Sequence, residues 1–346
     1  MKKNIFLVLL LLASVTWVGA QQMLPQADPF RVQVGGYLAA DYAKSEVDGR
    51  YPDGTFENPL LGLLMSGQLA PQISFMTEAT YYEGNRFDLY QAWMSFQASE
   101  YFDAKLGLYA VPFGQYNENN LPHQTDTVNP PLNIEYLFPF TWRDIGVTGG
   151  GSISGLDYVL YLGNGLSEGE FLYSGQQFRD NNRNKGWGGR LDLSLGEGFS
   201  VGYSYYRGKY DDANSRDRIL QAGTAVWATS DYYLKAEYNH SRSQNPNPFE
   251  DAEGWGYYIQ TAMVWKNFRP VVSYQVVKYD DTFHGPGFEG PDTPGEGFHL
   301  DRTRWALGAV FMFAQNAFLK LEYDFNREKD VEIKNDTWLV QVAVGF

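Results

Sequence analysis

Charged side chains alternate with large apolar ones along much of the chain, and these charges are the residues that could do chemistry. Residues 319–325 place Lys320, Glu322 and Asp324 on one face of an extended strand and apolar residues on the other. Such a row of ionised groups can attract or repel ions without making bonds. The same alternation predicts a wet interior lined by Arg86, Lys105, Arg143, Asp144, Arg190, Arg304 and Lys320. Alternatively, these charges are only solvated or paired across strands.

A second group of ionisable residues lies in residues 112–141, a long segment without strand periodicity. It carries Glu118, His123, Asp126 and Glu135, but no Lys or Arg. A structureless stretch of this length inside a compact fold is expected to be functional. A histidine in this loop could make permeation depend on pH, although a hydrogen-bonded loop histidine is the alternative.

Other kinds of site find little support in the sequence. The chain has no cysteine, which excludes disulfides and thiolate metal sites, and its four histidines show no metal-ligand spacing. Residues 285–290 match G-x-G-x-x-G, but prolines follow where a dinucleotide site needs a helix. Two acidic groups could bind calcium, although neither has the spacing of a known calcium loop: Asp211, Asp212 and Asp217; and Asp280, Asp281, Asp292, Glu296 and Asp301. We predict no cofactor, no metal and no enzymatic activity.

The first twenty residues have the composition of a secretory signal peptide. Lys2 and Lys3 precede the apolar residues 5–13, and Val18-Gly19-Ala20 offers a small-residue cleavage site. We therefore predict that residues 1–20 are a signal peptide and that residues 21–346 form one domain. The formal net charge of −14 argues against a nucleic-acid partner, which would require a basic surface.

A two-residue period is clearest at the C-terminus. The apolar positions there are Trp338, Val340, Val342, Val344 and Phe346, with small or polar residues mostly between them. Related patterns occur at residues 187–195, 199–205, 234–238, 255–265 and 305–313. One apolar and one polar face suits a strand between lipid and a wet lumen, although a soluble β-sandwich can show the same alternation.

The connections between these strands separate the two possibilities. Short turns are expected at residues 196–198, 229–231, 266–267 and 314–316, and long polar links at 164–186, 242–253 and 280–301. Short turns on one rim and long loops on the other are typical of transmembrane barrels. Counting the strands gives about 16, enough for a lumen that holds water. The predicted fold class is all-β: a transmembrane antiparallel β-barrel of about 16 strands with an inward-folded constriction loop.

Three segments resemble landmarks of a known family. Leu106-Gly107-Leu108-Tyr109-Ala110-Val111-Pro112-Phe113-Gly114 is similar to the G-x-x-x-x-P-F-G strand exit of the phosphate-selective porin O and P family. Thr141-Trp142-Arg143-Asp144-Ile145-Gly146-Val147 and Leu162-Gly163-Asn164-Gly165 are similar to two further landmarks. Phe346 resembles the terminal signal that the barrel-assembly machinery reads. Over nearly the whole mature chain the sequence therefore resembles bacterial outer-membrane porins, and this family most of all.

The resemblance implies a homotrimer of sixteen-stranded barrels in outer-membrane lipid, each narrowed by a loop after the fifth strand. Residues 112–141 occupy that position, so the resemblance implies that they form a constriction loop that folds inward. The acids of this loop would then face basic residues of the wall. In the phosphate-selective members, lysines on this loop and a ladder of arginines attract the anion. Here no Lys or Arg occurs between Lys105 and Arg143, so the charges that would match phosphate are missing from the loop.

From these patterns we predict a passive outer-membrane pore for small hydrophilic solutes or ions, weakly selective and slightly favouring cations. Three alternatives stay open: a phosphate- or anion-selective porin, a non-conducting barrel that scaffolds a surface complex, and an outer-membrane hydrolase. The predicted partners are outer-membrane lipid, two further copies of the chain, and the assembly machinery through Phe346.

Overall fold

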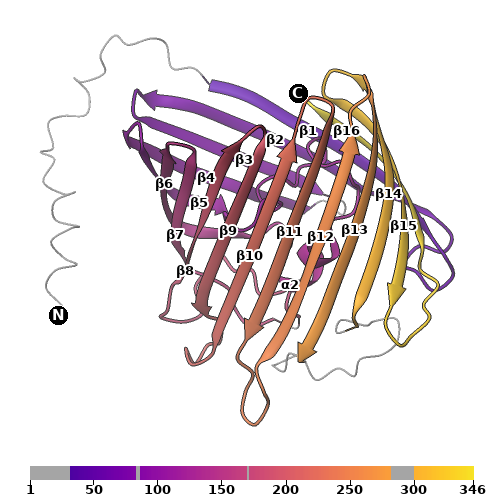
Figure 1. The fold of residues 1–346 in the computed structure, drawn as a ribbon. Helices are drawn as coiled ribbons and strands as arrows, with labels where there is room; N and C mark the ends of the chain where they lie inside the picture. Colours follow the sequence, from indigo (N-terminus) through magenta and orange to yellow (C-terminus); the bar gives the residue numbers. More distant parts are fainter. Residues whose placement is uncertain (1–31, 83–85, 170, 282–299) are drawn as a thin grey trace, which may run out of the picture. The chain divides into compact units, whose positions relative to one another are not determined.

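The computed structural model describes residues 32–82, 86–169, 171–281 and 300–346. Within them, sixteen antiparallel strands each pair with the next along the chain, and β1 pairs with β16 to close a barrel (Figure 1). The strands are β1 (Val32–Ser45), β2 (Thr55–Ala70), β3 (Ile73–Tyr82), β4 (Arg86–Ser99), β5 (Phe102–Ala110), β6 (Arg143–Ile153), β7 (Leu156–Gly163), β8 (Gly186–Gly196), β9 (Phe199–Lys209), β10 (Asp217–Ala228), β11 (Tyr232–Ser243), β12 (Ala252–Met263), β13 (Phe268–Asp281), β14 (Arg302–Ala314), β15 (Ala317–Glu328) and β16 (Thr337–Gly345). The predicted fold class is confirmed. The proposed signal peptide lies outside the described residues.

The two rims of the barrel carry different connections. One rim has only short turns, at residues 71–72, 100–101, 154–155, 197–198, 229–231, 264–267 and 315–316. Ser154 and Gly155 both have positive φ, 49° and 84°, as a two-residue type I′ hairpin requires. The described connections on the other rim are longer: residues 46–54, 111–142, 164–185, 210–216, 244–251 and 329–336. The predicted arrangement of turns and loops is therefore confirmed.

The barrel is apolar outside and polar inside, the reverse of a soluble domain. In β16, Trp338 is 60 % exposed, whereas Gln341 on the opposite face is 5 % exposed. In β15, Lys320, Glu322 and Asp324 all point inward and are buried. Because a soluble sandwich would keep these charges on its outer face, this polarity excludes that alternative. Among the described residues, no helix is long and apolar enough to cross a membrane.

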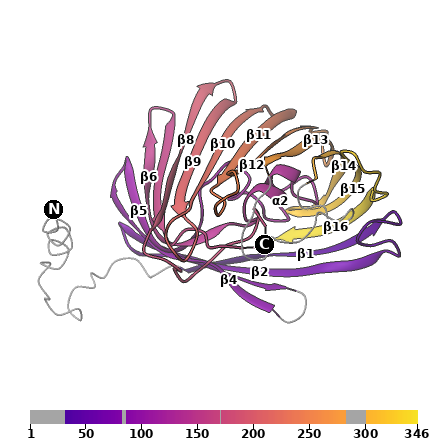
Figure 2. The same ribbon diagram turned by 90° about the horizontal axis from the view of Figure 1, so that it is seen from below.

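The buried core lies inside the barrel. The connection after β5, residues 111–142, folds inward and contains the one-and-a-half-turn helix α2 (Leu132–Leu137), which contacts β11, β12, β13 and β14. Viewed along the barrel, α2 lies within the ring of strands (Figure 2). The sequence predicted an inward-folded constriction loop at residues 112–141; in the structure the connection spans residues 111–142, and we call it the constriction loop.

The polarity of the wall can be tested at two adjacent residues of β7. Leu160 is 65 % exposed on the outer face, and Val159 lines a cavity on the inner face. We expect Leu160→Arg to lower the free energy of unfolding in lipid vesicles by about 2–4 kcal/mol, because it places a cation in hydrocarbon. Val159→Arg should cost much less, because its charge would face water. Denaturant titration of both variants checks this, and equal costs would contradict the assignment of the two faces.

Candidate functional site

The constriction loop enters the lumen through the Pro-Phe-Gly segment singled out in the sequence. Phe113 is buried, and Gly114 has a φ of +62°, which glycine adopts without strain. The Glu237 carboxylate lies against Gly114, 2.0 Å from where a Cβ would be, and accepts hydrogen bonds from the amides of Gln115 (3.0 Å) and Tyr116 (3.2 Å). The glycine thus allows a wall carboxylate to approach the backbone and fix the first turn of the loop.

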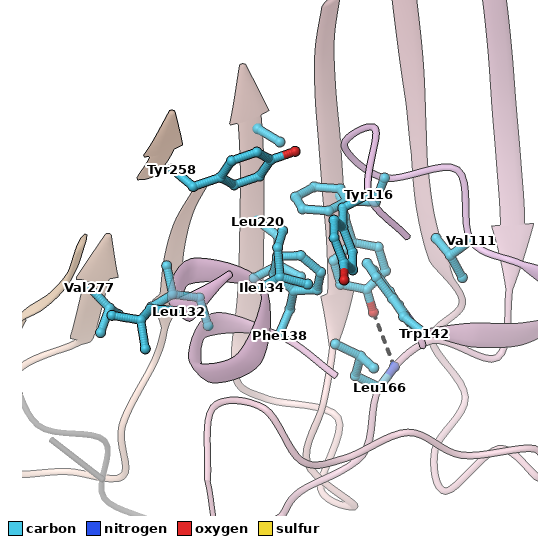
Figure 3. Close-up of a cluster of buried hydrophobic side chains, with 14 of the residues drawn as sticks. Val111, Tyr116, Leu132, Ile134, Phe138, Trp142, Leu166, Leu220, Tyr258 and Val277 are labelled. Atoms are coloured by element: carbon cyan, nitrogen blue, oxygen red, sulfur yellow. Dashed lines mark hydrogen bonds between the residues drawn. The ribbon is translucent and has the colours of Figure 1, made fainter. Parts of the chain in front are cut away.

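An aromatic cluster holds the loop against one side of the wall (Figure 3). The ring of Phe113 packs edge-on to Phe138 at 5.1 Å and to Trp142 at 5.7 Å, and Trp142 packs on Tyr206 of β9 at 4.8 Å. The Tyr206 hydroxyl also accepts a hydrogen bond from the Leu166 amide at 3.1 Å, which ties the connection after β7 to the cluster. Burying these rings is the main apolar contribution to the position of the loop.

Asn117 fastens the two ends of the loop to each other. Its amide nitrogen donates to the carbonyls of Val111 and Trp142, both at 2.8 Å, and its oxygen accepts from the Trp142 amide at 2.8 Å. All these groups are buried. Without a side-chain amide at this position, the buried Trp142 amide would lose its acceptor, whereas the two carbonyls would keep the backbone amides of Val111 and Phe113 as donors.

Each acid of the constriction loop pairs with an arginine of the wall. Glu118 Oε2 lies 2.5 Å from Arg190 Nη1 on β8, and Glu135 Oε2 lies 3.7 Å from Arg304 Nη1 on β14. The third acid, Asp126, pairs with Arg269 on β13 and also accepts from the hydroxyl of Tyr233. The acids predicted to face the wall therefore do so at direct contact, and their charges are largely neutralised there.

The loop also provides partners for buried charges on β14 and β15. Lys320 Nζ donates to Thr125 Oγ1 at 2.9 Å, and Glu322 Oε2 accepts from the Val128 amide at 2.5 Å. Asp324 accepts from Asn129 Nδ2 at 2.8 Å, and its Oδ2 lies 3.5 Å from Arg304 Nε. The predicted pore-lining residues Arg304 and Lys320 thus face inward, but the loop covers them.

Two predicted pore-lining residues, Arg143 and Asp144, have other surroundings. They are adjacent in β6 and so point to opposite faces. Asp144 accepts amide hydrogen bonds from Ile145 (2.7 Å), Asn164 (3.0 Å) and Gly165 (2.9 Å), which fixes the start of the connection after β7. Asp144 therefore holds the first two residues of this connection in place.

Arg143 shares the outward parity of Ile145 and is nevertheless buried. It donates to the Leu89 carbonyl at 3.1 Å and stacks on the ring of Tyr90 at 4.9 Å, both in β4. Its guanidinium bridges to β4 where β5 leaves the wall. Arg143 and Asp144 are therefore both buried and held by protein groups, and their place in the lining of the pore stays a prediction.

The remaining predicted residues lie in different places. Arg86 lies at the rim with loops, highly exposed, 3.7 Å from Asp88. His123 packs beside the ring of Tyr37, with 5.7 Å between ring centroids, and its Nδ1 has no hydrogen-bond partner in the described part of the chain. A cavity of about 190 Å³ between the start of the loop and β4 to β8 is lined by Lys105, Glu118 and Arg190 among others.

A larger cavity of about 250 Å³ lies between the loop and the wall formed by β1, β2, β3, β4 and β16. None of the residues predicted from the sequence as pore-lining or loop charges lines it. A further cavity of about 230 Å³, near the rim with loops, is lined by Arg50, Arg302 and Arg304 together with Asp48 and Glu328. The lumen is therefore divided into spaces of different charge.

One of the two acidic groups considered for calcium is already satisfied by protein. Both carboxylate oxygens of Asp211 accept hydrogen bonds, from the Ser215 amide (2.9 Å), the Ser215 hydroxyl (2.6 Å) and the Arg216 amide (2.7 Å). Burial would raise the pKa of Asp211, but these hydrogen bonds outweigh it and the pKa is lowered. Across the residues described, no group of three or more potential metal ligands occurs. The second acidic group lies partly outside them.

Sequence reasoning missed Arg269, which holds the loop, and it missed the contact that Glu237 makes with the loop. Arg269 follows the outward-facing Phe268 at the start of β13, so the alternation places it inside. Its pairing with Asp126 had no sequence signal, because the two residues are far apart in the chain. Glu237 was visible as an inward-facing acid of β11, but its contact with Gly114 depends on how the loop folds.

The comparisons with known proteins agree with the fold. No family model matches the chain. An uncharacterised protein of Aquifex aeolicus is 28 % identical over 124 residues, and this match spans 33 % of the chain and 28 % of the relative's length. Several solved structures resemble this chain in fold but share little of its sequence.

Among these structures is an anion-selective porin from Comamonas acidovorans, with a TM-score of 0.68, 11 % identity, and coverage of 92 % of this chain and 100 % of that chain. OmpF of Salmonella typhi, in complex with daunomycin, has a TM-score of 0.65, 15 % identity and coverage of 92 % and 98 %. The trimer form of OmpT from Vibrio cholerae has a TM-score of 0.66, 11 % identity and coverage of 92 % and 100 %. The chain has the sixteen-stranded fold of bacterial outer-membrane porins; the resemblance to the porin O and P family in particular stays a prediction.

The loop–wall pairs differ in burial, and this predicts different mutational costs. Arg304→Gln would leave Asp324 and Glu322 buried beside each other without their arginine. We expect a loss of about 3–5 kcal/mol, as for a broken buried ion pair. Arg86→Gln, which removes an exposed pair, should cost about 0–1 kcal/mol. Unfolding in detergent or vesicles measures both, and a similar cost for the two variants would show that the Arg304 contacts do not stabilise the barrel.

Proposed function

We propose that the protein is a passive outer-membrane pore for small hydrophilic solutes or ions, with a lumen of fixed width and weak selectivity. One observation carries the proposal. A closed barrel with an apolar outer face holds its own constriction loop inside, by buried rings and three arginine–carboxylate pairs, on the side formed by β8 to β15. The porin fold of the similar structures supports the same function.

The pairing of the loop acids with arginines of the wall supports weak selectivity. Glu118, Asp126 and Glu135 are each in contact with an arginine, so a permeating ion meets paired charges instead of three free carboxylates. Arg190 and Arg304 are each shared with a second acid of the wall, Asp192 and Asp324, which leaves a weak negative excess there. This revises the expectation from sequence, which took the loop acids as the dominant charges. Phosphate selectivity is the alternative, and the cavity lined by Arg50, Arg302 and Arg304 near the rim with loops is the observation that favours it.

Location and partners belong to the same proposal. The apolar outer band fits outer-membrane lipid, with export through the predicted signal peptide. The trimer form of the similar OmpT structure supports a homotrimer. Phe346 is 61 % exposed at the end of β16 and joined to Gly36 of β1 by two backbone hydrogen bonds, of 2.8 and 2.9 Å, so it is accessible to an assembly factor before the barrel closes. The protein performs no catalytic step in this proposal.

A second candidate is a non-conducting barrel that scaffolds a surface complex. The observation that favours it is the extent of burial inside: Glu237, Gln260, Gln275 and Asp324, on β11, β12, β13 and β15, are all covered. Single-channel recording in planar bilayers separates the two candidates. Stepwise conductance supports the pore, and its absence in assembled protein supports the scaffold.

Selectivity can be tested with the loop acids. In wild-type protein we expect a reversal potential close to that of a non-selective pore in a salt gradient. The combined variant Glu118→Gln, Asp126→Asn and Glu135→Gln should shift the reversal potential toward anions and increase current noise, because three negative charges are removed and the loop loses its ionic anchors. Arg269 then has no carboxylate partner among the described residues, whereas Arg190 keeps Asp192 and Arg304 keeps Asp324.

The matched control for this variant is Asp88→Asn, which removes the acid of an arginine pair at the rim, away from the loop. It should leave the reversal potential unchanged. Strong anion selectivity of the wild type, with phosphate blocking the chloride current, would overturn weak selectivity and favour the phosphate-selective alternative.

A further inference from the structure

The cavity between the constriction loop and β1, β2 and β16 has an unusual combination of side chains. Two carboxylates line it, Asp41 and Glu57, and no Lys or Arg is among the described residues that do so. Five aromatic rings complete much of its surface: Tyr37, Tyr82, Tyr90, Tyr116 and Phe140. Carboxylates together with ring faces make an environment that attracts a positive charge attached to an apolar body.

The two carboxylates lie directly opposite each other on neighbouring strands. Asp41 of β1 pairs with Glu57 of β2, immediately beside a bulge in the register. Asn58, in the bulge, has a φ of +51° and donates to Asp41 Oδ2 at 3.2 Å. Like charges facing each other across a strand pair destabilise a sheet, and Asp41 is only 7 % exposed, so water screens it poorly. A cation between them would remove this cost.

A buried acceptor without a partner lines the same cavity. Gln341 of β16 is 5 % exposed and donates through Nε2 to Asp41 Oδ1 at 2.8 Å. Its Oε1 has no hydrogen-bond partner among the residues that the structure describes. A buried amide oxygen normally has one, and because this oxygen is enclosed by protein, its uncompensated partial charge adds to the negative potential at this side of the cavity.

The protein's own cations near the cavity are already engaged. Lys320 is held by Thr125 Oγ1 at 2.9 Å and does not line the cavity. Arg143 is held by the Leu89 carbonyl and stacks on Tyr90 at 4.9 Å, which also shows that this ring accepts a cation. Lys320 acts electrostatically on Asp41 from outside the cavity, but no basic side chain is among the described residues that line the cavity itself. A cation in direct contact with both carboxylates would therefore come from outside the chain.

We propose that this cavity binds the primary ammonium group of a small solute with a ring-shaped or apolar body. The ammonium supplies N–H donors for the two carboxylates, while the body packs against the rings. A metal ion fits less well, since the described residues contain no group of three or more metal ligands. An anion would meet two carboxylates. The inference rests on the proposed pore function, because the cavity would serve as a binding site for ammonium solutes that pass through the lumen.

The test uses calorimetry on the full-length, detergent-purified protein at about pH 7, with glucosamine as the probe. Glucose is the matched neutral compound, of the same ring size but with a hydroxyl in place of the ammonium. We expect glucosamine to bind and glucose to bind at least about tenfold more weakly, since hydrogen bonds between charged groups contribute at least that factor. Glu57→Gln should weaken glucosamine binding by about tenfold for the same reason.

Two further variants make the result specific. Asp41→Asn, a nearly isosteric change, should weaken binding as Glu57→Gln does. Asp103→Asn removes an acid that lines the cavity of about 190 Å³ between the start of the loop and β4 to β8, and it should leave binding unchanged. Circular dichroism and heat-dependent mobility on gels verify that each variant is a folded barrel.

The outcomes separate this inference from the pore function. Equal binding of glucose and glucosamine, or no heat with glucosamine in a folded protein that conducts, overturns the ammonium site and leaves the pore intact. Binding that depends on Asp41 and Glu57 in a protein that does not conduct supports the site and overturns the pore. Equal weakening by Asp103→Asn would show a general charge effect and also overturn the site.

Discussion

The charged side chains on the inner face of β13 to β15 can be buried only because the constriction loop supplies their partners. Arg304 and Lys320 lie among Glu322 and Asp324 with almost no access to water. Taken alone, such a row would carry a large desolvation penalty. Thr125, Val128 and Asn129 of the loop complete its hydrogen bonds. The loop and this part of the wall therefore stabilise each other.

Apolar packing and ion pairs have separate effects on the loop. The rings of Phe113, Phe138 and Trp142 hold the loop against one side of the barrel, because a large apolar area is buried there. This apolar contribution has little directional preference, so it does not fix the position of the loop along that side. The pairs with Arg190, Arg269 and Arg304 then fix its register along that side, because charge-assisted hydrogen bonds require particular geometry. The opposite side of the lumen, along β1, β2 and β4, keeps open space.

This division decides which charges a solute meets. The acids of the loop are neutralised where they touch the wall, whereas Asp41 and Glu57 face a cavity with no basic residue among its described lining. The net charge of the chain therefore does not show which charges a solute meets in each part of this lumen. Selectivity should depend on a few unpaired groups beside aromatic rings, more than on the acidic composition of the chain.

Much of the fold follows from the sequence alone. The two-residue alternation identified which face of strands such as β14, β15 and β16 is apolar, and the positions of glycine, asparagine and serine identified the turns, because both signals are local. Local signals also placed the constriction loop after the fifth strand and its acids within it. The partners of those acids, the outward parity of Arg143, and the cavity between Asp41 and Gln341 were decided by the tertiary structure. Each of these joins residues from distant strands, and their distances are set only when the barrel closes and the loop packs inside it.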